Sequence, residues 1–103
     1  MTRGDVYDVS WPALGLRPAV IVTRPVTIPY LANVTVVLVT TRVRGLPTEV
    51  ELGATQGVIE GSVANCDNVL TVPKSALAHQ RGALGPAERH ALDRALRTAL
   101  ALD

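Results

Sequence analysis

Hydrophobic residues follow a strand-like pattern along the first three quarters of the chain. Residues 6–9 form a short segment of this kind, and residues 19–22 and 34–40 are nearly continuous runs of β-branched and aliphatic side chains. Such runs are typical of buried strands. A further run covers residues 63–72 and ends at Pro73, whose missing N–H interrupts a strand ladder. Together these segments predict one curved antiparallel sheet.

Residues 48–52 alternate polar and apolar side chains. The two glutamates of this segment are expected to face water, and Val50 and Leu52 are expected to face the core, because side chains along a strand point to opposite faces in turn. We therefore predict a half-exposed strand here. Residues 53–61 are rich in turn-forming residues and predict a connection, and residues 73–77 predict a short helical turn.

The end of the chain changes to helical spacing. Gly85-Pro86 places a proline at the first helical position, and residues 82–85 predict only a loop before it. Apolar side chains then recur three and four residues apart, and charged side chains on the other face are expected to be solvated. The apolar set is Leu92, Ala95, Leu96, Ala99 and Leu100, and the charged set is Arg89, Asp93 and Arg97. We predict a single α+β, mostly β domain over residues 1–103, a small β-barrel with a C-terminal amphipathic helix.

Composition narrows the classes of protein. The net charge is only +1, but residues 1–45 carry five Arg against two Asp, so a basic groove is compatible with a near-neutral total. Apolar runs are too short to cross a bilayer, and the N-terminus lacks the apolar run of a signal peptide. With a single cysteine, Cys66, we expect a cytoplasmic protein without membrane association. We expect Cys66 to be a small buried hydrophobic residue.

Five segments carry a recognisable pattern and together span most of the chain: Arg3-Gly4-Asp5, Leu16 to Val22, Val36 to Thr41, Leu46 to Leu52 and Ser62 to Ser75. Their order and spacing resemble those of the MazF/PemK/Kid family of toxin endoribonucleases. The resemblance implies an SH3-like barrel of the CcdB/Kid type. It also implies the toxin of a type II toxin–antitoxin system, which acts as a homodimer with an RNA groove across the dimer interface. An antitoxin with an acidic tail is expected to occupy that groove.

The expected chemistry needs neither metal nor cofactor. RNA is cut when its own 2′-hydroxyl attacks the adjacent phosphorus and the 5′-oxygen leaves, so the enzyme supplies charge stabilisation and proton transfer. A guanidinium matches two phosphate oxygens and stays charged. The resemblance assigns this role to Arg17 and an active-site hydroxyl to Thr40, with Thr41 as its alternative. His79 and His90, in the loop and helix beyond the matched segments, are expected to be structural or exposed.

Other polar residues are candidates for RNA binding. Arg3 is expected to hold a phosphate near the site entrance or to be a surface charge beside a turn. Arg42 and Arg44 are expected to follow the RNA backbone, or else to be solvated loop charges. Asp67 and Asn68 fall where relatives carry an acidic residue and Gln, a pair able to read base edges through hydrogen bonds.

The chain also departs from the family pattern. The loop at residues 10–16 is short, which leaves Trp11 either to stack on a base or to cover the barrel. Leu70 stands where relatives often place Arg. Two alternatives remain open: a gyrase poison of the CcdB type, disfavoured because the C-terminus lacks an aromatic residue, and a binding module of barrel shape without catalytic activity.

Overall fold

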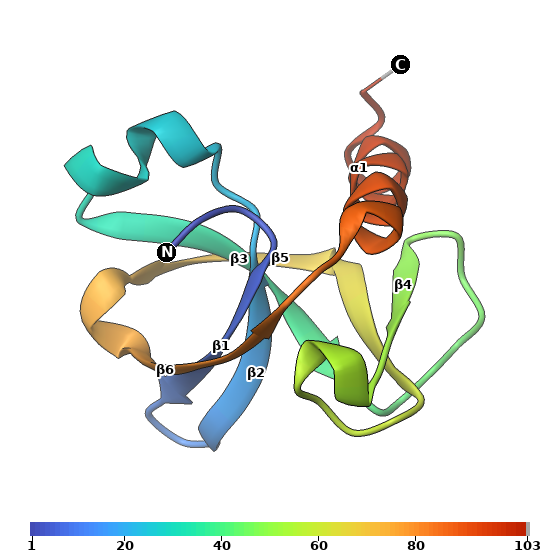
Figure 1. Ribbon diagram of the computed structural model, residues 1–103, viewed down its shortest axis with the longest axis horizontal. Helices are drawn as coiled ribbons and strands as arrows, with labels where there is room; N and C mark the ends of the chain where they lie inside the picture. The colour runs from blue at the N-terminus through green and yellow to red at the C-terminus, as the bar shows by residue number, and fades with distance from the viewer. Residues whose placement is uncertain (103) are drawn as a thin grey trace.

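The computed structural model describes residues 1–102 and forms one antiparallel sheet with a C-terminal helix (Figure 1). The strands are β1 (Asp5–Trp11), β2 (Gly15–Ile21), β3 (Asn33–Thr40), β4 (Glu49–Leu52), β5 (Ser62–Pro73) and β6 (Leu77–Ala83). Three short 3₁₀ helices, η1 (Pro25–Tyr30), η2 (Ala54–Gln56) and η3 (Lys74–Ala76), and the helix α1 (Pro86–Leu100) complete the fold. The strand order is β4-β5-β3-β2-β1-β6. The predicted mostly β fold with a terminal helix is confirmed.

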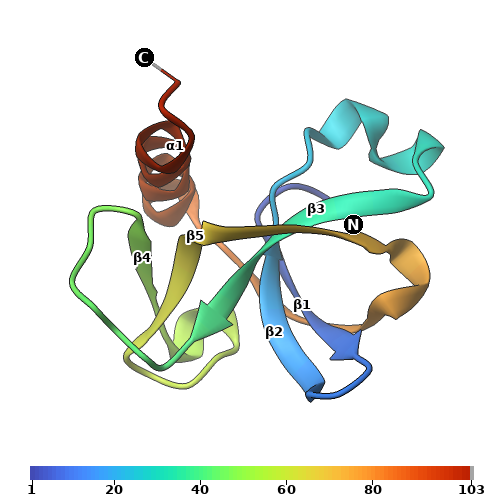
Figure 2. The same ribbon diagram turned by 180° about the vertical axis from the view of Figure 1, so that it is seen from behind.

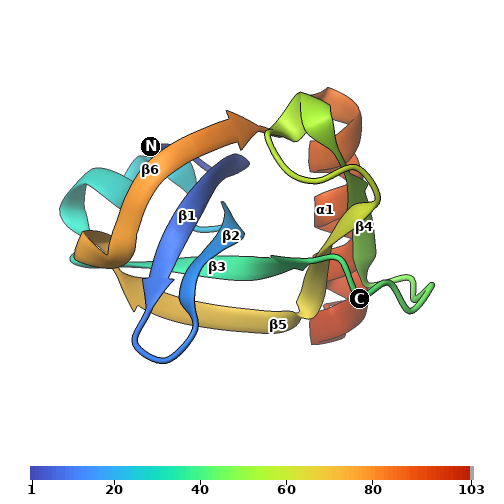
Figure 3. The same cartoon turned by 90° about the horizontal axis from the view of Figure 1, so that it is seen from below.

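The sheet curls into a half-barrel, as Figures 2 and 3 show from behind and from below. Its two edge strands are β4 and β6, and η2 bridges the space between them. Gly57, directly after η2, adopts a φ of 81°, and a side chain there would collide with the backbone carbonyl of Arg81 in β6. Glycine is therefore required where η2 meets β6.

Both faces of the central strands are buried, which explains their continuous apolar sequences. Val20 and Val37 belong to the cluster beneath α1, whereas their neighbours Ile21 and Val36 belong to a second cluster that contains Ile28 of η1. Successive residues of a strand point to opposite faces, so a strand covered on both sides has no polar alternation. The buried residues of the two clusters are mainly Val, Ile, Leu and Ala, and the chain has no Phe.

Helix α1 packs as its spacing predicts. Leu92, Ala95 and Leu96 are buried against the sheet, and Glu88 Oε1 accepts a hydrogen bond from the Gly85 N–H (3.0 Å) at the start of the helix. Leu100, the last residue of α1, is 51% exposed, which corrects its place in the predicted apolar set. Among residues 1–102, no helix is long and apolar enough to span a membrane.

Cys66 lies fully buried in the larger cluster, as expected for a small hydrophobic residue. Burial raises the pKa of the thiol to about 11, and the neighbouring Asp67 charge adds to the rise. A thiol with this pKa carries little thiolate at neutral pH and is a poor nucleophile.

Two elements were not predicted. The structure places residues 77–83 in strand β6, where the sequence indicated a loop that includes His79. The strand is exposed along most of its length and pairs with β1 through two register irregularities, so it carries no apolar alternation. The 3₁₀ helix η1 begins at Pro25 and contains Pro29, and only Ile28 within it is buried.

Candidate active site

The two residues with the strongest predicted roles start and end neighbouring strands. Arg17 lies near the start of β2, opposite Val9 of β1, and Thr40 is the last residue of β3, opposite Val63 of β5. The antiparallel pairing of β2 with β3 brings the start of one strand to the end of the other. In Figure 1 the β1–β2 hairpin lies at the lower end of the molecule, away from α1 at the top.

A groove of about 530 Å³, which we call the arginine groove, lies between this hairpin and the loop after β3. Six residues with predicted roles line it: Arg17, Thr40, Thr41, Arg42, Arg44 and Asn68. Its other polar lining residue is Asn65, and its apolar ones include Trp11 and Leu70. The lining set thus contains three arginines and no Asp or Glu, which makes the groove suited to an anionic ligand.

The Arg17 side chain is exposed and forms no hydrogen bond or ion pair with the rest of residues 1–102. Its five N–H donors are therefore available to a ligand. The proline that follows, Pro18, fixes the backbone at the strand that carries it. A guanidinium held on a strand, rather than on a loop, is well placed to contact a phosphate through two parallel hydrogen bonds.

Thr40 has a half-buried side chain whose Oγ1 accepts a hydrogen bond from the Arg42 N–H (3.1 Å). This contact occupies one acceptor position of the hydroxyl and leaves its own O–H to donate. It spans the bend at Thr41 and ties Arg42, two residues past the strand end, to Thr40. Thr41, the alternative, is exposed and lines the same groove.

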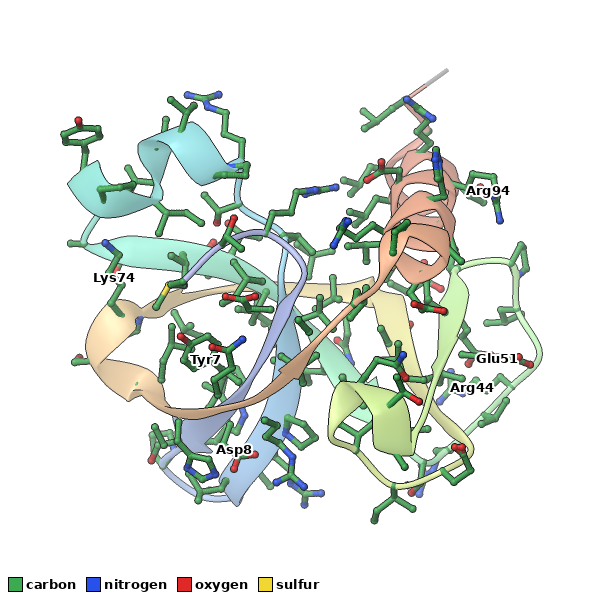
Figure 4. All side chains as sticks on the ribbon, viewed as in Figure 1. Tyr7, Asp8, Arg44, Glu51, Lys74 and Arg94 are labelled. Carbon is green, nitrogen blue, oxygen red and sulfur yellow. The ribbon has the colours of Figure 1, made fainter. Side chains whose placement is uncertain are left out.

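Glu49 organises the loop that carries Arg44. Its carboxylate accepts hydrogen bonds from the backbone N–H groups of Arg44 (3.0 Å), Gly45 (2.8 Å) and Leu46 (3.1 Å). Glu49 is half-buried and contacts this loop, which corrects the expectation that it simply faces water, whereas Glu51 is exposed as predicted. Figure 4 shows Arg44 on this loop.

Two opposing effects act on the pKa of Glu49. Desolvation raises the pKa. The three backbone N–H donors and the Arg44 charge lower it by more than desolvation raises it, so the net shift is downward from 4.5. Because the folded state favours the carboxylate, Glu49 stabilises the fold above its ordinary pKa, and this contribution is lost as the pH falls through the native pKa.

Glu49→Gln is therefore expected to lower the thermal midpoint at pH 7, since an amide replaces the charged acceptor of the loop N–H groups. The difference from wild type should shrink as the pH falls below 4.5. Thermal unfolding followed by circular dichroism from pH 3 to 7 measures this, with Glu51→Gln as the matched exposed control. A midpoint difference that does not change with pH would contradict the assignment.

Trp11 covers the barrel and also faces the arginine groove, where the other role considered for it, stacking on a base, stays a prediction. Its ring is half-buried and packs against the cluster that contains Val9 and Ile28, and it also lines the arginine groove beside Leu14 and Leu70. The indole Nε1 is buried and has no hydrogen-bond partner within residues 1–102. One face of the groove is therefore aromatic and apolar.

Two predicted RNA-binding residues lie outside the arginine groove. Arg3 forms an ion pair with Asp93 of α1 (2.8 Å) and donates to the Val22 carbonyl, which holds it beside the helix. Asp67 accepts a hydrogen bond from Thr48 Oγ1 (2.7 Å), on β5 but away from the groove lining. Arg3 and Asp67 thus lie apart from the other candidates for RNA binding. The ion pair with Arg3 also corrects the expectation that Asp93 is solvated.

A second hollow of about 380 Å³ adjoins the arginine groove and shares Arg17 and Thr40 with it. At its wall lies a cluster that sequence analysis missed: the buried Asp8 accepts hydrogen bonds from Arg81 Nη1 (3.2 Å to Oδ1), and Asp8 Oδ2 lies 2.9 Å from His79 Nε2. Figure 4 shows Asp8 near the β1–β2 hairpin. No sequence signal marks this cluster, because 71 residues separate its members and β6 was not predicted.

His90 is exposed on α1. Within residues 1–102, no three His, Cys, Asp or Glu side chains gather in a metal-binding arrangement.

Comparison with known proteins identifies the family. The model of the PemK-like, MazF-like toxins of type II toxin–antitoxin systems matches residues 2–100, and the chain belongs to this family. It is 46% identical over 87 residues to Endoribonuclease MazF3 of Mycobacterium tuberculosis, covering 84% of each chain. Among solved structures, it is similar to the Mycobacterium tuberculosis toxin MazF-mt6, with a TM-score of 0.89 and 40% identity over 96% of this chain and 98% of that one. It is also similar to a mycobacterial endoribonuclease in complex with its cognate antitoxin, with a TM-score of 0.90 and 34% identity over 100% and 97% of the chains.

Proposed function

We propose that this chain is the toxin of a type II toxin–antitoxin system and cuts single-stranded RNA as a sequence-selective endoribonuclease. The observation that carries the proposal is the meeting of Arg17 and Thr40 in a groove with two further arginines and no acidic lining residue. Relatives that cover most of the chain are named endoribonucleases, which supports the same reaction.

The proposed reaction uses the substrate's own 2′-hydroxyl. The 2′-hydroxyl gives up its proton as its oxygen forms a bond to the adjacent phosphorus. The bond from phosphorus to the 5′-oxygen breaks, and that oxygen takes up one proton, so the reaction consumes and releases no net proton. The products carry a 2′,3′-cyclic phosphate and a 5′-hydroxyl. Arg17 neutralises the charge that develops on the non-bridging oxygens, and Thr40 donates to one of them. No metal or cofactor has a role in this scheme, since the nucleophile belongs to the RNA and the charge is balanced by arginine.

Base selection is proposed to occur along the same groove. Asn68 and Asn65 present amide groups that donate and accept hydrogen bonds, and they can read the edges of unpaired bases. Trp11 offers a partly exposed aromatic face on which a base can stack, worth about 1–3 kcal/mol per base in single-stranded complexes. Arg42 and Arg44 then hold the phosphates of the same strand.

The proposed partner is a cognate antitoxin whose acidic tail fills the arginine groove and excludes RNA. The antitoxin complex of the 34% identical relative supports this partner, and a groove lined by three arginines and no acidic residue suits an anionic peptide. We further propose that the toxin acts as a homodimer in the cytoplasm, where its RNA substrate is found.

The test is incubation of the purified protein with a long mixed-sequence RNA in EDTA, followed by sequencing of fragment ends and analysis of their phosphates. Discrete fragments with 2′,3′-cyclic phosphate and 5′-hydroxyl ends are expected. Adding an excess of a synthetic acidic antitoxin tail should suppress them. RNA that stays intact would overturn the proposal, and inhibition of gyrase supercoiling in a parallel assay would then identify a gyrase poison.

A further inference from the structure

The Asp8 cluster holds Arg81 in one orientation at the second hollow. Arg81 Nε donates to the Gly57 carbonyl (2.8 Å), and Nη1 donates to both oxygens of Asp8 (3.2 and 3.3 Å). Asp8 is 4% exposed, while the Arg81 side chain is 37% exposed. The inner part of the guanidinium is thus anchored and a substantial part of the side chain still reaches solvent.

The Arg81 side chain keeps donors for a ligand. Its Nη2 group has no hydrogen-bond partner among residues 1–102, so two of its five N–H donors are unused. An arginine fixed by its own contacts loses little side-chain freedom when it binds a further anion, which favours binding. The packing of η2 against β6 at Gly57 keeps this arrangement in place.

The surroundings of Arg81 suit part of a nucleotide strand. The hollow shares Arg17, Thr40 and Thr41 with the arginine groove, so a strand that crosses Arg17 continues into it. Leu16 and Ile59, 53% and 70% exposed, supply apolar surface beside the guanidinium. The negative charge of Asp8 is balanced by Arg81 and, when protonated, by His79, so it does not repel the strand.

We propose that the second hollow is a further RNA subsite, in which Arg81 binds the phosphate next to the one that Arg17 contacts and Asp8 acts as a positioning residue for Arg81. The subsite lengthens the bound strand by one nucleotide beyond the arginine groove. This inference rests on the proposed endoribonuclease function, because it takes single-stranded RNA as the ligand.

Binding of RNA that cannot be cut tests the subsite independently of catalysis. The probe is a random-sequence 12-nucleotide single-stranded RNA with 2′-O-methyl groups, followed by fluorescence anisotropy at several salt concentrations. Arg81→Ala is expected to weaken binding about tenfold at low salt, since a charge-assisted contact is lost. The slope of log Kd against log salt should fall by about 0.7, the value for one single-strand phosphate. Arg94→Ala, the same change on α1 and far from Asp8 in Figure 4, is expected to bind as wild type does.

Two further variants separate RNA contact from support of the fold. Arg81→Lys keeps the positive charge but loses the planar guanidinium. It should bind RNA more weakly than wild type, with an unchanged slope of log Kd against log salt. Asp8→Asn should likewise retain the slope while weakening binding, because Arg81 is present but no longer held. If circular dichroism shows that Arg81→Ala is unfolded, the subsite is tested with Arg81→Lys and with the wild-type protein instead. Wild-type binding to the mapped cleavage sequence should then be sensitive to methylphosphonate at two adjacent phosphates.

The outcomes separate this inference from the proposed function. Wild-type cleavage together with unchanged RNA binding by Arg81→Ala, or sensitivity at only one phosphate, would overturn the subsite alone. Arg81-dependent RNA binding without any cleavage would support the subsite and overturn the endoribonuclease.

Discussion

A single 2′-deoxy substitution at the nucleotide on the 5′ side of the cut phosphodiester is expected to abolish cleavage. The proposed reaction has no other nucleophile, because the groove supplies guanidinium and hydroxyl groups that stabilise and orient but leave the attack to the RNA. Binding should weaken by no more than about tenfold, since a neutral hydrogen bond from one hydroxyl contributes about 0.5–1.5 kcal/mol. Loss of rate without a comparable loss of affinity is the result that distinguishes a missing nucleophile from a missing contact.

The measurement is single-turnover cleavage of an oligonucleotide that spans a mapped site, with binding followed in parallel. The control places the deoxy nucleotide two positions away, where cleavage should continue. Cutting of the strand with deoxyribose at the scissile position would mean that water or a protein side chain attacks phosphorus, and the proposed mechanism would be wrong.

The parts of the fold with strong local patterns could be predicted from the sequence. The buried strands β2, β3 and β5 have near-continuous β-branched runs, and α1 has both a proline at its start and a three- and four-residue apolar spacing. In each case the local sequence pattern favours the same element that burial in the folded protein requires. The arginine groove was predictable for a related reason, since Thr40, Thr41, Arg42 and Arg44 are close in the chain and need only the β2–β3 pairing to meet Arg17.

The parts that depend on distant contacts could not be predicted. Strand β6 has a polar, exposed sequence and exists because β1 offers it a free edge. Without β6 there was no reason to bring Arg81 or His79 to Asp8. Glu49 looked like an exposed strand residue, because only the folded loop directs three backbone N–H groups at its carboxylate. Arg3 lies in the segment that resembles the family, yet Asp93 of α1 holds it beside the helix.

Arg17→Ala is expected to lower the cleavage rate about 10²–10³-fold, the usual cost of removing one group that stabilises charge in a transition state. The groove would retain Arg42 and Arg44, so RNA should still bind, with a salt slope reduced by about 0.7 for one lost phosphate contact. The stability of the fold should not change, because the Arg17 side chain is exposed and makes no polar contact within residues 1–102. A large effect on rate, a small effect on affinity and none on unfolding together define a catalytic role.

Arg24→Ala is the matched control for this prediction. Arg24 is also an exposed arginine directly before a proline, but it lies at the start of η1 and lines a hollow beside α1 instead of the arginine groove. The two variants remove the same charge from an Arg-Pro pair, so a rate that falls only for Arg17→Ala assigns the effect to position. Arg17→Lys should recover only part of the rate, because an ammonium keeps the charge but cannot match two phosphate oxygens at once. Equal rates for Arg17→Ala and Arg24→Ala would remove Arg17 from the reaction and leave Arg42, Arg44 and Arg81 as the remaining sources of positive charge along the two hollows.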